Sequence, residues 1–237
     1  MLQFAPRGKS LDFGCGAGAL VAAARARGLD AYGAETFYGG DRSEDADLAR
    51  SWGCDANTLR EIKNGILDFP DNFFDIVVHN QVFEHVQNLE LAAAEIQRVL
   101  KPGGMMVGIF PILGVVKEVH LGLPCVHWFK PGPARLAWAK AMRRVGFGFD
   151  FWGEGDVWFE RSLKFLDEHV CFRTRKQTAA IIEPFFDVKW TEIDWLAFRV
   201  PKYKAALAVP GASFFARRFA RMVAGVVIEA RSRKTAE

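Results

Sequence analysis

The stretch Ser10-Leu11-Asp12-Phe13-Gly14-Cys15-Gly16-Ala17-Gly18-Ala19-Leu20 determines how the rest of the chain is interpreted. A short apolar run leads into three closely spaced glycines, and a helix-forming run of Ala, Leu and Val follows. Glycine lets the backbone adopt positive φ and approach a ligand closely, and the first turn of a helix presents unpaired N–H groups. The stretch therefore predicts a strand, a nucleotide-cradling turn at Gly14, Gly16 and Gly18, and a helix over 19–28.

A second anchor for a nucleotide is Glu35. It follows the apolar run 31–34 and lies about 20 residues beyond the glycines, where a ribose-binding acid is expected in a βαβ unit. The alternative is an exposed acid at a strand end, and a glycine turn alone also fits dinucleotide sites and plain tight turns. The two features together favour the ribose-binding interpretation.

Length and composition fit a single domain. The chain has 237 residues, half of them hydrophobic, and its 31 Lys and Arg nearly balance 28 Asp and Glu, so no nucleic-acid partner is expected. The four cysteines have no C-x-x-C spacing, which predicts neither a zinc site nor a disulfide framework. Without a visible signal peptide or a run of ~20 apolar residues, we expect a cytoplasmic location, with at most peripheral contact to a membrane.

The middle of the chain alternates strands and helices. Phe74–Asn80 is a β-branched strand suited to burial on both faces, and 89–100 carries apolar residues at helical spacing. Lys101-Pro102-Gly103-Gly104 is expected to end that helix and to turn the chain into a strand over 105–110. This βαβ alternation predicts a doubly wound, parallel α/β sheet with right-handed crossovers.

These segments resemble, in order, the motifs of class I S-adenosylmethionine-dependent methyltransferases, in particular bacterial small-molecule members of the type 11 kind. The motifs are Leu11-Asp12-Phe13-Gly14-Cys15-Gly16-Ala17-Gly18, Glu35, the run 69–78, Asn80-Gln81-Val82-Phe83-Glu84-His85-Val86, and Val99-Leu100-Lys101-Pro102-Gly103-Gly104. The resemblance implies one Rossmann-like domain over 1–237, with a mainly parallel seven-stranded sheet and an antiparallel last strand. It also implies in-line methyl transfer from S-adenosylmethionine without a protein nucleophile.

The same resemblance implies a set of cofactor-binding residues. The three glycines would approach the methionine portion, Asp12 would organise that loop and the methionine amino group, and Glu35 would hold the ribose hydroxyls. Thr36 would pack near adenine, and Asn80 and Gln81 would border the transferred methyl group unless Asn80 caps the next helix instead. The implied set is Asp12, Gly14, Gly16, Gly18, Glu35, Thr36, Asn64, Asn80 and Gln81.

Two features depart from the family pattern. The loop after the short strand 58–62 reads Ile62-Lys63-Asn64-Gly65-Ile66 and lacks the usual acid, so adenine recognition falls to the Asn64 amide or a backbone group. Only residues 1–9 precede the first strand, whereas the family usually has a helical lid there. Either that lid is absent or the chain is truncated, which bears on activity more than on fold.

Residues 112–185 are expected to form a cap on the acceptor side, because they follow the carboxyl end of a strand and are rich in aromatics. Within it, Glu118, His120 and His127 have pKa values suited to taking a proton from an acceptor, and His120 and His127 are the candidate bases. A structural role for each histidine is an equally good interpretation. No metal site is expected, because the His and Glu spacing supports none in particular.

The last part of the chain predicts two strands, over 186–193 and 225–231, with a helical insertion over 202–222 between them. In 214–222, Phe and Met alternate with Arg, which is typical of an amphipathic helix on an anionic membrane or partner surface. The simpler interpretation is a helix docked on its own domain with a solvated basic face.

Three functions compete at this point. A methyltransferase acting on a small-molecule, lipid-linked or glycan acceptor fits every motif. A nicotinamide oxidoreductase fits only the glycines and Glu35, and a non-catalytic, methyltransferase-like binding module fits the fold without the chemistry. The oligomeric state does not follow from the sequence.

Overall fold

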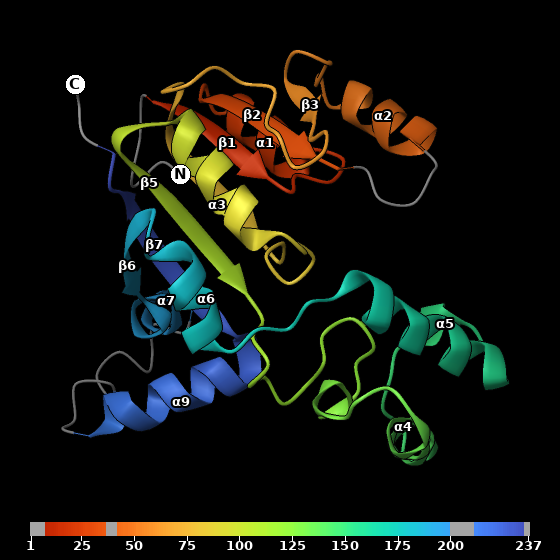
Figure 1. Cartoon of the computed structure of the whole chain (residues 1–237). Coiled ribbons are helices and arrows are strands. Elements are labelled where there is room, and N and C mark those ends of the chain that lie inside the picture. The colour runs from red at the N-terminus through yellow and green to blue at the C-terminus, as the bar shows by residue number, and fades with distance from the viewer. Residues whose placement is uncertain (1–7, 37–41, 200–210, 235–237) are drawn as a thin grey trace.

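A seven-stranded mixed sheet organises the molecule in the computed structural model, which describes residues 8–36, 42–199 and 211–234 (Figure 1). The strand order is β3-β2-β1-β4-β5-β7-β6, and the first five strands are parallel while β7 runs antiparallel to β5 and to β6. The strands are β1 (Lys9–Phe13), β2 (Asp30–Glu35), β3 (Leu59–Glu61), β4 (Phe74–Asn80), β5 (Leu100–Phe110), β6 (Phe186–Trp190) and β7 (Val226–Ser232). The predicted α/β class is confirmed.

Helices connect these strands and cover the sheet. They are α1 (Ala19–Arg25), α2 (Arg42–Ser51), α3 (Leu89–Val99), α4 (Pro133–Arg144), α5 (Gly155–His169), α6 (Arg175–Ile182), α7 (Glu192–Arg199) and α9 (Ala212–Ala224), with short 3-10 turns at Val126–Trp128 and Asp150–Trp152. Helix α3 is capped by Asn88, whose side-chain oxygen accepts a hydrogen bond from the Leu91 N–H at 3.1 Å. Asn80 therefore does not cap this helix.

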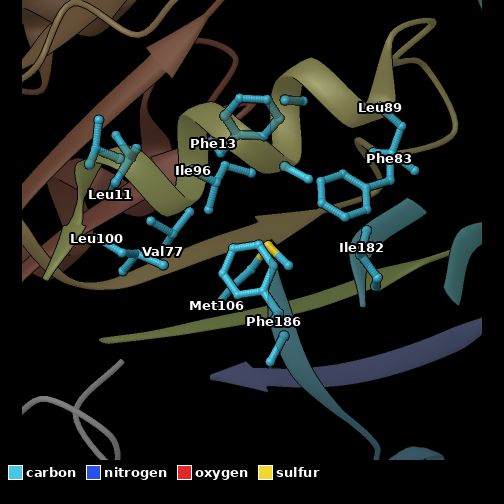
Figure 2. Packing of buried hydrophobic residues seen from close by; sticks show 14 of the residues in the cluster. Leu11, Phe13, Val77, Phe83, Leu89, Ile96, Leu100, Met106, Ile182 and Phe186 are labelled. Carbon is cyan, nitrogen blue, oxygen red and sulfur yellow. The ribbon is translucent and has the colours of Figure 1, made fainter. Parts of the chain in front are cut away.

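The main core lies between the sheet and helices α3 and α6. Figure 2 shows side chains of α3, such as Leu89 and Ile96, meeting side chains of the strands, such as Val77 and Met106. Apolar residues recur along α3 at helical spacing, so one face of the helix is buried against the sheet. This packing fixes β1 and β4, whose carboxyl ends carry the predicted site.

Two predicted boundaries are wrong. The stretch Lys101-Pro102-Gly103-Gly104 does follow the end of α3 at Val99, but β5 already begins at Leu100, before the expected start at Met105, and is irregular between Leu100 and Met105. The strand expected over 186–193 ends at Trp190, and Glu192 begins α7. Glu192 and Asp194 lie in the first turn of that helix, where acidic residues are favoured by the helix dipole.

Helices α4 and α5 lie away from the sheet (Figure 1) and have an apolar cluster of their own around Trp158, Leu121 and Leu123. Helix α6 also falls within the predicted cap range 112–185, but its Ile182 belongs to the main core. The segment after β5 is tied to the rest through backbone hydrogen bonds, including Leu113 N–H to Arg173 O at 2.9 Å.

Helix α9 covers the second half of the predicted insertion 202–222, while residues 202–210 lie outside the described residues. Its Arg221 faces the domain and bonds Glu192 Oε1 through Nε at 2.9 Å. Its aromatic side chains point outward instead, with Phe214, Phe215 and Phe219 all more than 60% exposed. None of the described helices is long and apolar enough to cross a membrane.

Candidate functional site

The carboxyl ends of β1, β2 and β4 meet at one edge, because these strands are parallel neighbours in the sheet. A pocket of about 150 Å³ opens there. Larger hollows beside β3 and between α4 and α5 contain none of the predicted site residues. The strand-end pocket is lined by Phe13, Gly14, Glu35, Thr36, Ile62, Gln81, Val82, His85 and Val86.

The glycine turn after β1 forms one wall of this pocket. Gly14, Gly16 and Gly18 all have positive φ, at 77°, 52° and 85°. A Cβ on Gly14 would lie 2.4 Å from Val82 Cγ2, and one on Gly18 would lie 2.6 Å from Leu59 Cδ1, whereas Gly16 has no atom within 4 Å of that position. Gly14 and Gly18 are thus required by packing and by backbone conformation, and Gly16 leaves open space beside the turn.

Glu35 links the end of β2 to the glycine turn. Its Oε2 accepts a hydrogen bond from Gly16 N–H at 2.9 Å. Its Oε1 accepts from the backbone N–H of Thr36 at 2.7 Å and from the Thr36 hydroxyl at 3.1 Å. The carboxylate is therefore held at the pocket wall by groups that a hydroxyl-bearing ligand can extend or replace.

Asp12 lies under the turn in β1 and is only 5% exposed. Burial, followed by repulsion from the Glu35 carboxylate, raises the pKa of Asp12 from 3.8 to about 7. Above that pH, Asp12 adds its negative charge to that of Glu35 beside the pocket, which suits a ligand that carries positive charge.

The residues after β4 also line the pocket. Gln81 has φ of 57° and lines the pocket, and its side-chain Oε1 is buried without a hydrogen-bond partner among the described residues. Asn80, one residue earlier, is exposed and is not part of the pocket lining. Positive φ at Gln81 turns the chain sharply at the strand end, and this brings Gln81 and Val82 to the pocket.

Asn64 is not part of this lining. It is exposed, with φ of 53°, in a tight turn closed by Lys63 N–H to Ile66 O at 3.2 Å. The same loop contributes Ile62 to the pocket instead. The structure thus brings together Gly14, Glu35, Thr36 and Gln81 at one cavity, with Asp12 buried beneath them, and leaves Asn64 and Asn80 outside its lining.

The two candidate bases lie in different surroundings. His120 is 16% exposed, and its Nδ1 is 2.6 Å from Glu118 Oε1 while its Nε2 is 3.1 Å from His85 Nε2. Because His85 lines the pocket, His120 is connected to it through one intervening ring. His127 packs on Phe172, with ring centroids 4.5 Å apart, and burial lowers its pKa.

Among the polar residues that line the pocket, His85 is the one that sequence reasoning missed. It belongs to the quoted run Asn80-Gln81-Val82-Phe83-Glu84-His85-Val86 but received no role there. Arg173 holds this loop in place, since its guanidinium donates to the backbone carbonyls of Phe83, Val86 and Gln87 at 2.7 to 3.2 Å. The signal in sequence was a histidine close after a strand end, which alone does not identify its partner.

Comparison with known proteins adds an independent finding. Residues 11–108 match the family described as a methyltransferase domain. An uncharacterized methyltransferase of Schizosaccharomyces pombe is 55% identical over 61 residues, which make up 26% of this chain and 19% of that relative. The chain thus aligns with about a fifth of the length of that curated relative.

Several solved structures share the fold. An S-adenosylmethionine-dependent methyltransferase from Mesorhizobium loti is 17% identical with a TM-score of 0.55, over 95% of this chain and 91% of that one. The YcgJ protein from Bacillus subtilis is 17% identical with a TM-score of 0.51, over 96% and 93%. Geranyl diphosphate C-methyltransferase from Streptomyces coelicolor is 16% identical with a TM-score of 0.50, over 96% and 70%. At these identities the likeness concerns the fold alone.

Proposed function

We propose that this chain is a class I methyltransferase that transfers the methyl group of S-adenosylmethionine to an acceptor, because its residues 11–108 match the methyltransferase-domain family. The observation that carries the proposal is the coincidence of the glycine turn and the Glu35 carboxylate in one strand-end pocket, within the matched region. S-Adenosylmethionine supplies a sulfonium-activated methyl group, so the residues of the chain have to bind the cofactor, orient the acceptor toward its methyl group and exclude water.

The pocket fits the parts of such a cofactor. Glu35 offers two carboxylate oxygens to ribose hydroxyls, and the open space at Gly16 leaves room beside the turn. The negative potential at Asp12 and Glu35 suits the positive ammonium and sulfonium groups. Ile62 and Thr36 would flank adenine, and Gln81 would border the methyl group.

Binding of the cofactor is the first measurement we would make. Titration calorimetry of the full chain should show binding of S-adenosylmethionine and S-adenosylhomocysteine but not of NAD. Glu35→Ala removes the carboxylate that would accept hydrogen bonds from the two ribose hydroxyls, so this variant should bind S-adenosylmethionine about 10- to 100-fold more weakly. The variant Glu35→Gln keeps an oxygen for Gly16 N–H and should show a smaller loss.

Glu61→Gln is the matched control. Glu61 is the register partner of Glu35 on β3 but does not line the pocket, so its replacement should leave affinity unchanged. A folded chain that binds neither S-adenosyl compound would refute the proposed function for this chain, as would tighter binding of NAD. Binding without turnover over a broad panel of acceptors would instead favour the non-catalytic module.

For the acceptor we propose a lipid-linked molecule among the small-molecule, lipid-linked and glycan classes. The support comes from α9, whose Phe214, Phe215 and Phe219 are 62% to 71% exposed beside the exposed Arg217 and Arg218. Such a face matches an anionic membrane surface in both polarity and charge. Helix α9 also touches the segment after β5, since Val116 N–H donates to Met222 O at 2.8 Å.

Vesicle sedimentation tests this surface. The chain should bind vesicles that contain an anionic phospholipid and should bind neutral phosphatidylcholine vesicles at least about 10-fold more weakly. Replacing Phe214, Phe215 and Phe219 together with Ser should remove binding. Phe151→Ser, which changes an equally exposed aromatic beyond α9, is the control. Equal sedimentation of the triple variant and the unchanged chain would contradict a membrane role for α9.

A further inference from the structure

Three potential metal ligands converge beside the pocket. Glu84 and His85 come from the loop after β4, and His120 comes from the segment after β5. Their ligand atoms all lie within 4.8 Å of one another, and the two Nε2 atoms are only 3.1 Å apart. Residues separated by 35 positions in sequence are thus brought to one point.

Both imidazole rings are oriented by acceptors on their far side. His85 Nδ1 is 2.7 Å from the backbone carbonyl of His169, which can only accept, so this nitrogen carries the proton. His120 Nδ1 is 2.6 Å from Glu118 Oε1. With both Nδ1 atoms engaged by acceptors, the two Nε2 atoms face each other at 3.1 Å, where a shared proton or a metal ion can lie between them. This is the pattern by which outer hydrogen bonds orient metal-binding histidines.

Glu118 is itself firmly held. It is completely buried, and its Oε2 accepts hydrogen bonds from the backbone N–H groups of His120 at 3.0 Å and of Leu121 at 2.6 Å. The carboxylate, its ring partner and the loop between them form one unit, so the position of His120 Nε2 is fixed before any ligand arrives.

Glu84 is the third member and the most telling one. It is 2% exposed, and among the described residues no hydrogen bond from another residue reaches either carboxylate oxygen. Its Oε1 lies 4.0 Å from His85 Nε2. A buried carboxylate without such a partner is costly, and a cation at the two imidazoles would satisfy it.

We propose that Glu84, His85 and His120 bind a divalent transition-metal ion, with Zn²⁺ as the best suited. Two imidazoles and one carboxylate, with a further position open, form a known type of catalytic zinc set. Zn–N bonds of ~2.0–2.1 Å at bond angles near 90–110° place two nitrogens about 2.9–3.4 Å apart, and the observed separation of 3.1 Å falls in that range. Glu84 reaches the ion by a small movement of its side chain.

The site adjoins the cofactor pocket, because His85 belongs to both. An ion there has an open position for an oxygen or nitrogen ligand, and Lewis-acid binding lowers the pKa of such a ligand. This role in holding the acceptor rests on the proposed function, whereas binding of the ion does not.

Metal titration of the full chain tests the site. After chelator treatment and its removal, calorimetry with Zn²⁺ should show one site with a dissociation constant below about 10 µM. Co²⁺ should give the visible absorption of a low-coordinate site. The three single variants Glu84→Gln, His85→Ala and His120→Ala should each weaken Zn²⁺ binding by at least about 10-fold. Glu84→Gln preserves the shape of the side chain and removes a buried charge, so this variant should fold.

His127→Gln is the matched control, since it changes a histidine of the same segment outside the cluster, and it should bind Zn²⁺ like the unchanged chain. A dissociation constant for Zn²⁺ above about 1 mM, or equal Zn²⁺ affinity in all variants, would overturn the metal site. The two Nε2 atoms would then share a proton. Titration with S-adenosylmethionine separates the two proposals. If the chain binds Zn²⁺ but not S-adenosylmethionine, the metal site stands and the methyltransferase function is refuted. If it binds S-adenosylmethionine but not Zn²⁺, the metal site is refuted and the methyltransferase function stands.

Discussion

Gly14→Ala is expected to remove cofactor binding and to lower the free energy of unfolding by roughly 2–4 kcal/mol. Gly14 has φ of 77°, so any side chain there is strained. The new Cβ would also lie 2.4 Å from Val82 Cγ2, at the pocket wall. Relief of that overlap has to move either the turn or Val82, and both line the pocket. We expect at least a ~100-fold loss of affinity for S-adenosylmethionine, because several contacts shift together.

Comparison with Gly28→Ala separates the steric part of this effect from the backbone strain. Gly28 also has φ of 77°, but no atom lies within 4 Å of the position of an added Cβ. Its replacement should cost only the backbone strain, about 1 kcal/mol, and leave cofactor affinity unchanged. Urea unfolding and titration calorimetry of both variants provide the comparison. Equal destabilisation by the two substitutions, or unchanged affinity in Gly14→Ala, would show that the contact with Val82 does not shape the pocket.

Asp12→Asn is expected to stabilise the unliganded chain at pH 8 by roughly 2–4 kcal/mol. The pKa of Asp12 is raised from 3.8 to about 7, first by burial and then by the Glu35 carboxylate. Between these pH values the folded chain keeps a proton that the unfolded chain has released. The contribution of Asp12 to stability therefore declines as pH rises from about 4 to about 7, and the full cost is present above pH 7.

The amide variant removes this pH dependence. Unfolding by urea at several pH values should show almost no difference between Asp12→Asn and the unchanged chain near pH 4, and a growing difference up to pH 8. Affinity for S-adenosylmethionine should change in the opposite direction and fall by about 10-fold at pH 8, since the variant removes a negative charge beneath the pocket that would attract a cationic ligand. A stability difference that is constant with pH would mean that Asp12 titrates normally.

Much of the fold followed from local sequence. The strand, the glycine turn and the helix at 10–25 are set by a short run of residues whose backbone preferences leave few alternatives, and β4 matched its prediction at both ends. The βαβ alternation predicted the parallel part of the sheet, because such connections allow only a few strand arrangements, and the family resemblance implied the seven strands that the structure shows. Boundaries were less certain where two rules competed, as at Leu100 and at Glu192.

The site was predictable only in part. One pocket is lined by Gly14, Glu35, Thr36 and Gln81, because the carboxyl ends of neighbouring parallel strands lie at the same edge of the sheet. This rule can be applied once the strands have been predicted from the sequence. Asn64 and Asn80 lie outside the lining because a tight turn and a one-residue rotation direct them elsewhere. Rotation at a left-handed residue depends on the neighbouring loop, so sequence spacing does not determine it.

By itself, the sequence determined the part of the pocket formed by the glycine turn and Glu35, since the connection of two adjacent strands places both. The tertiary structure alone decided the cluster of Glu84, His85 and His120 beside this pocket. There, His120 meets His85 and Glu84 only because Arg173 fixes one loop and Glu118 fixes the other. Short-range backbone rules act over a few residues, whereas this cluster depends on packing between segments far apart in the chain.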